Sequence, residues 1–309
     1  MNQHTPRNDP AHSAPGEPPA AARLQRDSEI CFMPAARMAS LIRQSKLSAR
    51  DVMAAHLNQI DRVNPRLNAI ITLLPHDQLL AQAQAADEAI VHGRHLGPLH
   101  GIPIGVKDNY ETSGIRTTFG SVLFRDYVPE FDCLVVEREK HAGAIIVGKT
   151  NLPEFGLGSQ TFNKVFGATP NPYDLTKTCG GSSGGGAVAL ACGMLPLADG
   201  GDMGGSLRNP PDFCNVVGLR TSPGRVPNSP SLLGWQTQGV AGPMARNVAD
   251  CGGPGAEGTG RLADRWKWAS GDGQGGRRMQ RFLRHELEND SEDHFGSAAP
   301  QGRHLREPE

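Results

Sequence analysis

The chain has 309 residues, enough for one large or two ordinary domains, and its 31 Lys and Arg against 32 Asp and Glu give a formal net charge of −1. This balance excludes the strongly basic composition of nucleic-acid binders and of proteins that bind anionic membranes, so we expect neither partner. No run approaches the roughly 18 apolar residues that suggest a membrane span. The N-terminus lacks the apolar core of a signal peptide, and we therefore expect a cytoplasmic protein.

The cysteines are scattered and contain no CxxC pair, which disfavours a disulfide framework or a cysteine-based metal site. We therefore expect reduced thiols, no metal and no cofactor. The six positions are Cys31, Cys133, Cys179, Cys192, Cys214 and Cys251.

Residues 1–27 are rich in Pro, Ala, His and Asn without any periodicity, and this composition predicts a disordered leader. Helical periodicity begins further on. Ser48-Ala-Arg-Asp51 is typical of a capping box and predicts a helix over Val52–Val63, which Asn64-Pro65 would end. A second helix is predicted from Asp77 to about Val91, closed by Gly93.

The middle of the chain alternates strand and helix patterns. Apolar residues alternate with small ones over 102–106, which predicts a short strand with Lys107 at its carboxyl end. Residues 132–142 suggest a helix, and the β-branched run 144–147 suggests a buried strand. This alternation favours an α/β fold, in which sites lie at the carboxyl ends of the strands.

Two glycine-flanked serine clusters, GGSSGGG at 180–186 and GDMGGS at 201–206, surround a predicted buried helix over Ala187–Met194. So many glycines in one segment imply tight turns or close approach of the backbone. Serine hydroxyls beside free main-chain N–H groups suit acyl transfer, which needs a nucleophile and donors for an oxyanion. A short strand over 216–219 and a turn over 222–225 follow.

The segments GIPIGVKDN, GGSSGGG, GDMGGSLRNP and FCNVVGLRTSPGRVP together resemble the amidase signature family of serine hydrolases, from about residue 29 to 250. The resemblance implies an α/β fold with a mixed central sheet flanked by helices, and a Ser–Ser–Lys triad that cleaves small-molecule carboxamides. Ser206 matches the nucleophile, Ser182 the bridging serine and Lys107 the base. The separations, 182 − 107 = 75 and 206 − 182 = 24, also resemble those of the family.

The same resemblance assigns further roles around the nucleophile. It implies a cis peptide bond before Ser182, a supporting hydrogen bond from Ser183, and a nucleophile loop buttressed by Asp202 and Arg208. The oxyanion hole would consist of four main-chain N–H groups, those of Met203, Gly204, Gly205 and Ser206.

Elementary chemistry is consistent with this assignment. A serine hydroxyl is a weak nucleophile that needs a proton acceptor, the four motifs contain no His, and a buried lysine can be neutral near pH 7. GGSSGGG lacks the GK[ST] ending of a P-loop, and no GxGxxG follows a strand, so a nucleotide site is not expected. Cys214 is an alternative nucleophile, although its apolar neighbours favour a buried packing role.

The run from Gly218 to Asp250 resembles general bacterial amidases more than the amidotransferases that act with tRNA, in which the corresponding chain usually has a KPTYGRVS-like segment. A stand-alone amidase is therefore favoured. Two alternatives remain, a catalytically silent remnant and the A-type component of a tRNA-dependent amidotransferase. The oligomeric state is left open between monomer and homodimer.

Residues 251–309 show no helical or strand period and few aliphatic side chains, which predicts a disordered tail after an amidase signature domain at 28–250. The resemblance stops at 244–250, where a helix would begin, and the fold would then be incomplete at its carboxyl end. We expect a truncation or a reading-frame shift near codon 250, which translation of the other two frames tests. The missing layers would leave Lys107 solvated, with its pKa near the free value.

Overall fold

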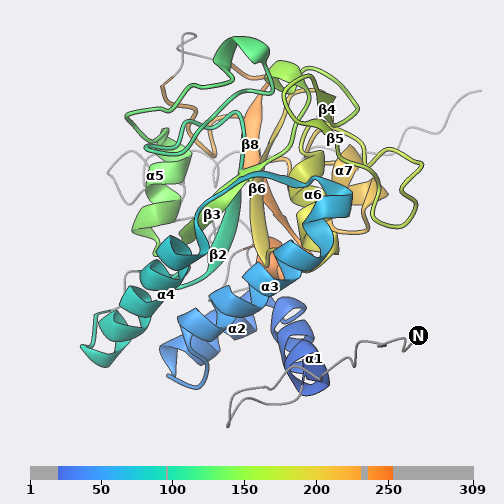
Figure 1. The fold of residues 1–309 in the computed structure, drawn as a ribbon. Helices are drawn as coiled ribbons and strands as arrows, with labels where there is room; N and C mark the ends of the chain where they lie inside the picture. The colour runs from blue at the N-terminus through green and yellow to red at the C-terminus, as the bar shows by residue number, and fades with distance from the viewer. Residues whose placement is uncertain (1–19, 95–96, 231–235, 253–309) are drawn as a thin grey trace, which may run out of the picture. The chain divides into compact units, whose positions relative to one another are not determined.

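The computed structural model describes residues 20–94, 97–230 and 236–252, and its central element is a six-stranded sheet (Figure 1). The strand order is β1-β3-β2-β6-β8-β7. The strands of this sheet are β1 (Ile70–Leu73), β2 (Pro103–Lys107), β3 (Ile145–Thr150), β6 (Leu197–Asp202), β7 (Val217–Gly218) and β8 (Val240–Ala245). A separate hairpin consists of β4 (Phe162–Asn163) and β5 (Gly167–Ala168).

The sheet is mixed, as the sequence predicts for an α/β fold. Strand β2 runs parallel to its neighbours β3 and β6, whereas β1, β8 and β7 pair in antiparallel fashion. Parallel neighbours end at the same edge of a sheet, so the segments that follow β2, β3 and β6 begin close together. Their loops lie at the top of Figure 1.

The helices surround this sheet, and α6 packs against β1, β2, β3, β6 and β8. Helix α3 contacts β2 and in turn packs against α1 and α4. The helices are α1 (Ala20–Cys31), α2 (Ala35–Arg43), α3 (Ala49–Leu67), α4 (His76–Val91), α5 (Leu134–His141), α6 (Gly184–Ala191), α7 (Asn209–Phe213) and α8 (Val248–Cys251). Two short 3-10 turns, η1 (Val122–Phe124) and η2 (Glu154–Gly156), lie in the loops.

Local signals in the sequence account for the start of α3. The Ser48 hydroxyl accepts a hydrogen bond from the Asp51 N–H at 2.9 Å, which confirms the predicted cap. The predicted end at Asn64-Pro65 is wrong, because the helix continues to Leu67. A proline in the last turn removes only one helical hydrogen bond, and Asn68 in the left-handed region (φ 47°) ends the helix.

The second predicted helix is confirmed as α4, after which Gly93 adopts a positive φ of 67°. The helix between the serine clusters is confirmed, although α6 covers 184–191 and therefore lies three residues earlier than predicted. Gly193, with a φ of 67°, ends it before Met194.

The predicted leader is wrong at its carboxyl end, because residues 20–27 belong to α1. Packing against α3 explains the difference: Ile30 and Cys31 are buried there, and Arg26 forms an ion pair with Asp51 at 2.6 Å. Composition alone does not reveal such a tertiary contact. The rest of the predicted leader, residues 1–19, lies outside the described residues.

The helix expected to begin at 244 is also wrong, because Met244 and Ala245 belong to β8 and the helix α8 begins only at Val248. All six residues of β8 are buried, and they pair with β6 over its full length. Burial on both faces gives such a strand no alternating pattern. Of the predicted tail, only 251–252 are described, and 253–309 lie outside the described residues.

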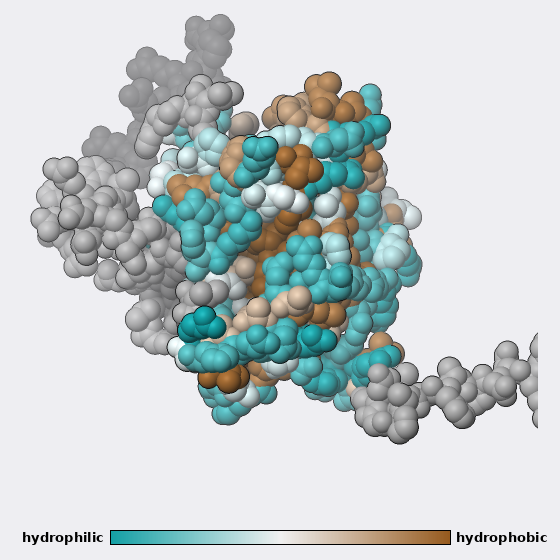
Figure 2. Space-filling view, turned by 60° about the vertical axis from the view of Figure 1, so that its left-hand side comes forward, coloured by the Kyte–Doolittle hydropathy of each residue, from teal (hydrophilic) through white to brown (hydrophobic). Residues whose placement is uncertain are grey.

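Exposed hydrophobic side chains are frequent in the loop around η1, and Leu123 is 80% exposed. Figure 2 shows hydrophobic surface at the top of the molecule and along a furrow between two hydrophilic rims.

Over the described ranges, no helix combines the length and hydrophobicity of a transmembrane segment. No group of three or more His, Cys, Asp or Glu within those ranges could hold a metal ion.

Candidate active site

Strand β2 brings Lys107 into the interior of the protein. All five residues of the strand are buried, and Lys107, its last residue, is 1% exposed. Gly105 leaves room for neighbouring side chains, because a Cβ there would require the ends of the Leu195 and Thr150 side chains to move. The Lys107 amine points toward the main chain of Gly201, where a Cβ would lie 3.9 Å from Nζ.

The first serine cluster packs tightly against the loop that follows β3. A Cβ on Gly185 would lie 2.2 Å from the Asn151 nitrogen, so the first turn of α6 accepts only glycine there. The peptide bond between Gly181 and Ser182 is cis, as the resemblance implies. Ser182 is 3% exposed and lies just before the N-terminus of α6.

The three residues predicted to carry the chemistry form one continuous hydrogen-bonded chain. The Ser206 Oγ lies 2.8 Å from the Ser182 Oγ, which lies 2.7 Å from the Lys107 Nζ. Ser206 is 7% exposed, so among these three hydrogen-bonded residues it lies closest to the surface. The tertiary structure thus brings together residues that are 24 and 75 positions apart in the sequence.

Ser183 supports the amine from a second side. Its Oγ accepts a hydrogen bond from Lys107 Nζ at 3.0 Å and donates one to the Gly201 carbonyl oxygen at 3.2 Å. The hydrogen bond from Ser183 thus runs to the Gly201 carbonyl, and the supporting role of Ser183 stays a prediction. Because the Ser183 proton is directed at the carbonyl, the Lys107 amine donates to Ser183, and it donates likewise to the Ser182 hydroxyl and, at 3.4 Å, to the Gly201 carbonyl oxygen.

Burial lowers the pKa of Lys107 to about 7, and the charges of Asp199 and Asp202 oppose this shift. The expectation of a solvated lysine with a pKa near the free value is therefore wrong. Strands β3 and β6 on either side of β2, together with α6, already exclude water from the amine. A substantial fraction of the amine is uncharged at neutral pH.

Asp202 is hydrogen-bonded to the loop that carries Ser206. Its carboxylate accepts hydrogen bonds from the N–H groups of Gly205 at 2.8 Å and Leu207 at 3.2 Å, and from Arg208 Nε at 2.9 Å. Gly205 adopts a φ of 126°, which favours glycine. The turn between β6 and α7 is therefore organised around one buried carboxylate.

Arg220 is a further ligand of this carboxylate that sequence analysis missed. Its Nη1 donates to Asp202 Oδ1 at 2.8 Å and also to the Asp202 carbonyl oxygen. Burial by itself would raise the pKa of the Asp202 carboxyl, but the hydrogen bonds from Arg208, Gly205 and Leu207 outweigh it and lower that pKa to about 2. Asp202 is therefore charged at neutral pH. Arg220 lies in the segment FCNVVGLRTSPGRVP, but nothing in that segment assigns it to Asp202.

The four main-chain amides predicted as oxyanion donors do not share the same environment. The Gly205 N–H already donates to Asp202 at 2.8 Å, so it is engaged in this structure. For the N–H groups of Met203, Gly204 and Ser206, no hydrogen-bond acceptor is found within the described residues. The oxyanion role remains a prediction for these three amides, and Met203 is 52% exposed at this position.

Asp199 and Tyr110 also lie beside this site and were not predicted. Asp199 is 3% exposed and accepts a hydrogen bond from the Lys107 main-chain N–H at 2.6 Å. The Tyr110 hydroxyl donates to the Gly200 carbonyl oxygen at 3.1 Å. The sequence does contain one signal for Asp199, because a charged residue interrupts the apolar run before GDMGGS.

Cys214, the alternative nucleophile, has a packing role. Its side chain is completely buried, and its Sγ donates to the Cys179 carbonyl oxygen at 3.8 Å. Burial raises the pKa of the Cys214 thiol far above its usual value, so the thiol remains protonated.

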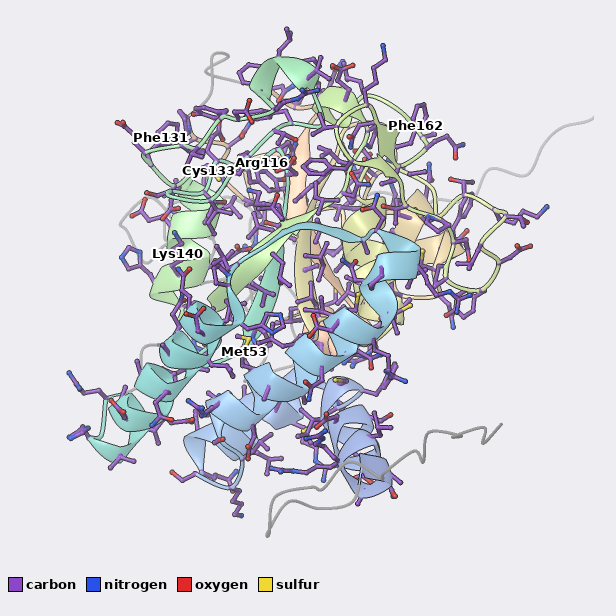
Figure 3. The ribbon with its side chains drawn as sticks, in the orientation of Figure 1. Met53, Arg116, Phe131, Cys133, Lys140 and Phe162 are labelled. Atoms are coloured by element: carbon purple, nitrogen blue, oxygen red, sulfur yellow. The ribbon has the colours of Figure 1, made fainter. Side chains whose placement is uncertain are left out.

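The loops beyond the strand ends surround Ser182 and Ser206. A Cβ on Gly156 would lie 3.6 Å from the Ser182 Oγ, so the η2 segment passes directly beside that hydroxyl. Figure 3 shows Arg116 at the end of the sheet where the loops gather, and Met53 of α3 nearer the opposite end. Phe155 and Leu157 are 44% and 69% exposed, which makes this rim partly hydrophobic.

Comparison with known proteins is consistent with this geometry. The family described as Amidase matches residues 51–252. The chain is 41% identical over 208 residues to the A subunit of the glutamyl-tRNA(Gln) amidotransferase of Alkaliphilus metalliredigens, covering 67% of this chain and 42% of that protein. It is 42% identical over 216 residues to the corresponding protein of Methylococcus capsulatus, covering 70% and 44%. The chain thus spans less than half the length of these curated relatives.

Solved structures show the same fold. A bacterial aryl acylamidase of the amidase signature family superposes with a TM-score of 0.68 at 30% identity, covering 75% of this chain and 46% of the acylamidase. The peptide amidase of Stenotrophomonas maltophilia superposes with a TM-score of 0.64 at 35% identity, covering 72% and 46%.

Proposed function

Because the chain belongs to the amidase family, we propose that it cleaves carboxamide C–N bonds through an acyl-enzyme on Ser206. The observation that carries this proposal is the hydrogen-bonded chain from Ser206 through Ser182 to a buried Lys107. A nucleophile, a relay and a base that is partly neutral at pH 7 are the components that acyl transfer requires.

The first half of the reaction forms the acyl-enzyme. Ser206 gives its proton to Ser182, Ser182 gives its own proton to the Lys107 amine, and the Ser206 oxygen attacks the carboxamide carbon. Negative charge then develops on the carbonyl oxygen, and the N–H groups of Met203, Gly204 and Ser206 stabilise it. Loss of one such donor typically costs about 3–4 kcal/mol of transition-state stabilisation.

The tetrahedral intermediate collapses when a proton returns from the Lys107 ammonium through Ser182 to the nitrogen of the leaving group. The C–N bond breaks, ammonia or an amine departs, and the acyl group remains esterified to Ser206. Water then attacks the ester and gives its proton to Lys107 through the same hydroxyl. The C–O bond of the ester breaks as the proton returns from the Lys107 ammonium through Ser182 to the Ser206 oxygen, which releases the carboxylic acid and restores the free serine.

Two substrate classes have specific support. The identity of about 40% to the glutamyl-tRNA(Gln) amidotransferase proteins favours a primary amide that serves as a nitrogen donor. The structural similarity to an aryl acylamidase and a peptide amidase favours hydrolysis of small amides by a stand-alone enzyme. Both classes require the same attack of Ser206 on a carboxamide carbon.

An active-site-directed fluorophosphonate tests the proposal, because it reacts only with an activated serine. We expect stoichiometric labelling of Ser206, located by peptide mass spectrometry, and no labelling of Ser206→Ala. Ser222→Ala, which changes an exposed turn serine, serves as the matched control and should be labelled like wild type.

An assay of ammonia or amine release then distinguishes the two substrate classes. Glutamine and asparagine test for a primary-amide nitrogen donor, and anilides and peptide amides test for hydrolysis of small amides. Folded, monodisperse wild-type protein that is not labelled and releases neither product would contradict the proposal. That result would identify the chain as a catalytically silent member of the family.

A further inference from the structure

Asp199 is a buried acidic residue that the proposed reaction does not use. It lies on β6, beside the end of β2, and is 3% exposed. One carboxylate oxygen, Oδ1, accepts the Lys107 main-chain N–H at 2.6 Å. The other, Oδ2, is buried and has no hydrogen-bond partner within the described ranges. Buried carboxylate oxygens usually have partners, so this arrangement requires an explanation.

The register of the sheet explains the first contact. Strands β2 and β6 pair at Ile104 with Leu197 and at Gly105 with Ala198, and the pairing stops there. The Asp199 side chain takes up the next main-chain donor, that of Lys107, in place of a strand partner. It therefore fixes the position at which the Lys107 side chain leaves the strand.

The second consequence is electrostatic. Two acidic side chains act on the Lys107 amine, Asp199 and Asp202, and both belong to β6. Asp202 is already paired with Arg208 and Arg220, so much of its charge is compensated. No cation lies within hydrogen-bond distance of the Asp199 carboxylate among the described residues, so its charge is the less compensated of the two.

Asp199 also faces charged groups from other elements. Burial raises the pKa of its carboxyl group, whereas the hydrogen bond from the Lys107 N–H and the charges of Lys149 and Lys107 lower it. The charge of Asp199 also adds to burial in raising the pKa of Tyr110 and of Cys133. Glu139 of α5 is buried nearby, and both its own burial and the charge of Asp199 raise its pKa. Asp199 is therefore the carboxyl group of this cluster that can change its charge near neutral pH while it is bonded to the Lys107 backbone.

We propose that Asp199 is a positioning residue of the active site, which fixes the end of β2 through the Lys107 main chain and governs proton uptake by the Lys107 amine through its own charge. This inference rests on the proposed function of Lys107 as the base. When Asp199 is ionised, it stabilises the ammonium form of Lys107. When it is protonated, the neutral amine is favoured.

Asp199→Asn separates the two roles, because asparagine keeps a carbonyl oxygen for the Lys107 N–H and removes the charge. We expect the pH at which Lys107 is half protonated to fall by about one unit, because a nearby opposite charge is lost. The rising part of the curve of fluorophosphonate labelling rate against pH should shift to lower pH by the same amount. Asp199→Ala also removes the acceptor and should slow labelling about tenfold at every pH.

The Lys107 titration is read directly from its side-chain ¹⁵N NMR signal, assigned by its absence in Lys107→Met. In wild type we expect a two-step curve, because the signal also reports the ionisation of Asp199, and in Asp199→Asn a single step. Asp77→Asn removes an exposed carboxylate on α4 and should leave the wild-type curve unchanged.

A single-step wild-type titration overturns the inference, even if the variant fails to fold. An unchanged midpoint in folded Asp199→Asn also overturns it, while labelling of Ser206 would leave the proposed function intact. If the midpoint moves but Ser206 is never labelled, the proposed function fails and the control of Lys107 by Asp199 stands.

Discussion

Two buried lysines lie at the ends of neighbouring strands, and their surroundings differ. Lys107 ends β2 and Lys149 is the penultimate residue of β3, and both are almost completely buried. Lys107 pairs in register with Thr150, so Lys149, one position earlier, points to the opposite face of the sheet. Burial lowers the pKa of both side chains.

The partners of the two amines distinguish them. The Lys107 amine contacts the hydroxyls of Ser182 and Ser183, and Ser182 leads on to Ser206. The Lys149 amine contacts the Tyr110 carbonyl oxygen and the Thr112 hydroxyl, which belong to the loop after β2. A desolvated amine is therefore not a base by itself, because it also needs a neighbour through which a nucleophile can deliver its proton.

The largest expected effect is the loss of labelling in Lys107→Met. Removal of a general base typically costs about 10²–10⁴-fold in rate, and we expect that loss in the second-order rate constant of fluorophosphonate labelling. Folded Lys149→Met should react within about threefold of wild type, because its amine does not face the serines. Equal losses in the two variants would contradict the distinction.

The next effect concerns the free energy of unfolding, which we expect Lys149→Met to lower more than Lys107→Met. Lys149→Met leaves the Tyr110 carbonyl without its partner and removes a cation whose charge lowers the pKa of both Asp108 and Asp199. Loss of a buried hydrogen bond from a charged donor costs about 1.5–3 kcal/mol in the free energy of unfolding, which urea denaturation measures. Lys107→Met replaces an amine that is partly neutral, so a smaller cost of about 1 kcal/mol is expected.

The smallest effect is the pH dependence of labelling in wild type. A base must be uncharged, and burial lowers the pKa of Lys107 to about 7, so the labelling rate should rise with pH up to about 7 and level off above it. The rise should be less steep than tenfold per pH unit, because Asp199 ionises over the same range and then favours the ammonium form. In folded Lys149→Met, the labelling rate should also rise with pH up to about 7. A flat profile between pH 5 and 8 would show that Lys107 does not take up the proton.

Local and short-range features could be predicted from the sequence. The cap formed by Ser48 and Asp51, the strand that ends at Lys107 and the helix after the first serine cluster depend on neighbouring residues. The extent of α1 and the strand β8 are missed by the sequence analysis because both depend on packing between distant segments, whereas the wrong end of α3 has a local cause, the left-handed Asn68 beyond Pro65. Arg220 likewise bonds to Asp202, 18 residues earlier in the chain, and its neighbours in the sequence do not indicate that contact.

The order of residues by itself determined which side chains could take part: two serines held in glycine-rich turns, one lysine after an apolar strand, and an aspartate beside the second serine. Glycine spacing and apolar alternation are local properties of the chain, so they can be read without coordinates. The resemblance already implied Lys107 as the base, but only the tertiary structure showed that the equally buried Lys149 contacts Tyr110 instead of the serines, and that Asp199 holds the Lys107 backbone. The register of β2 between β3 and β6 sets both contacts, and pairing between strands from different parts of the chain determines that register.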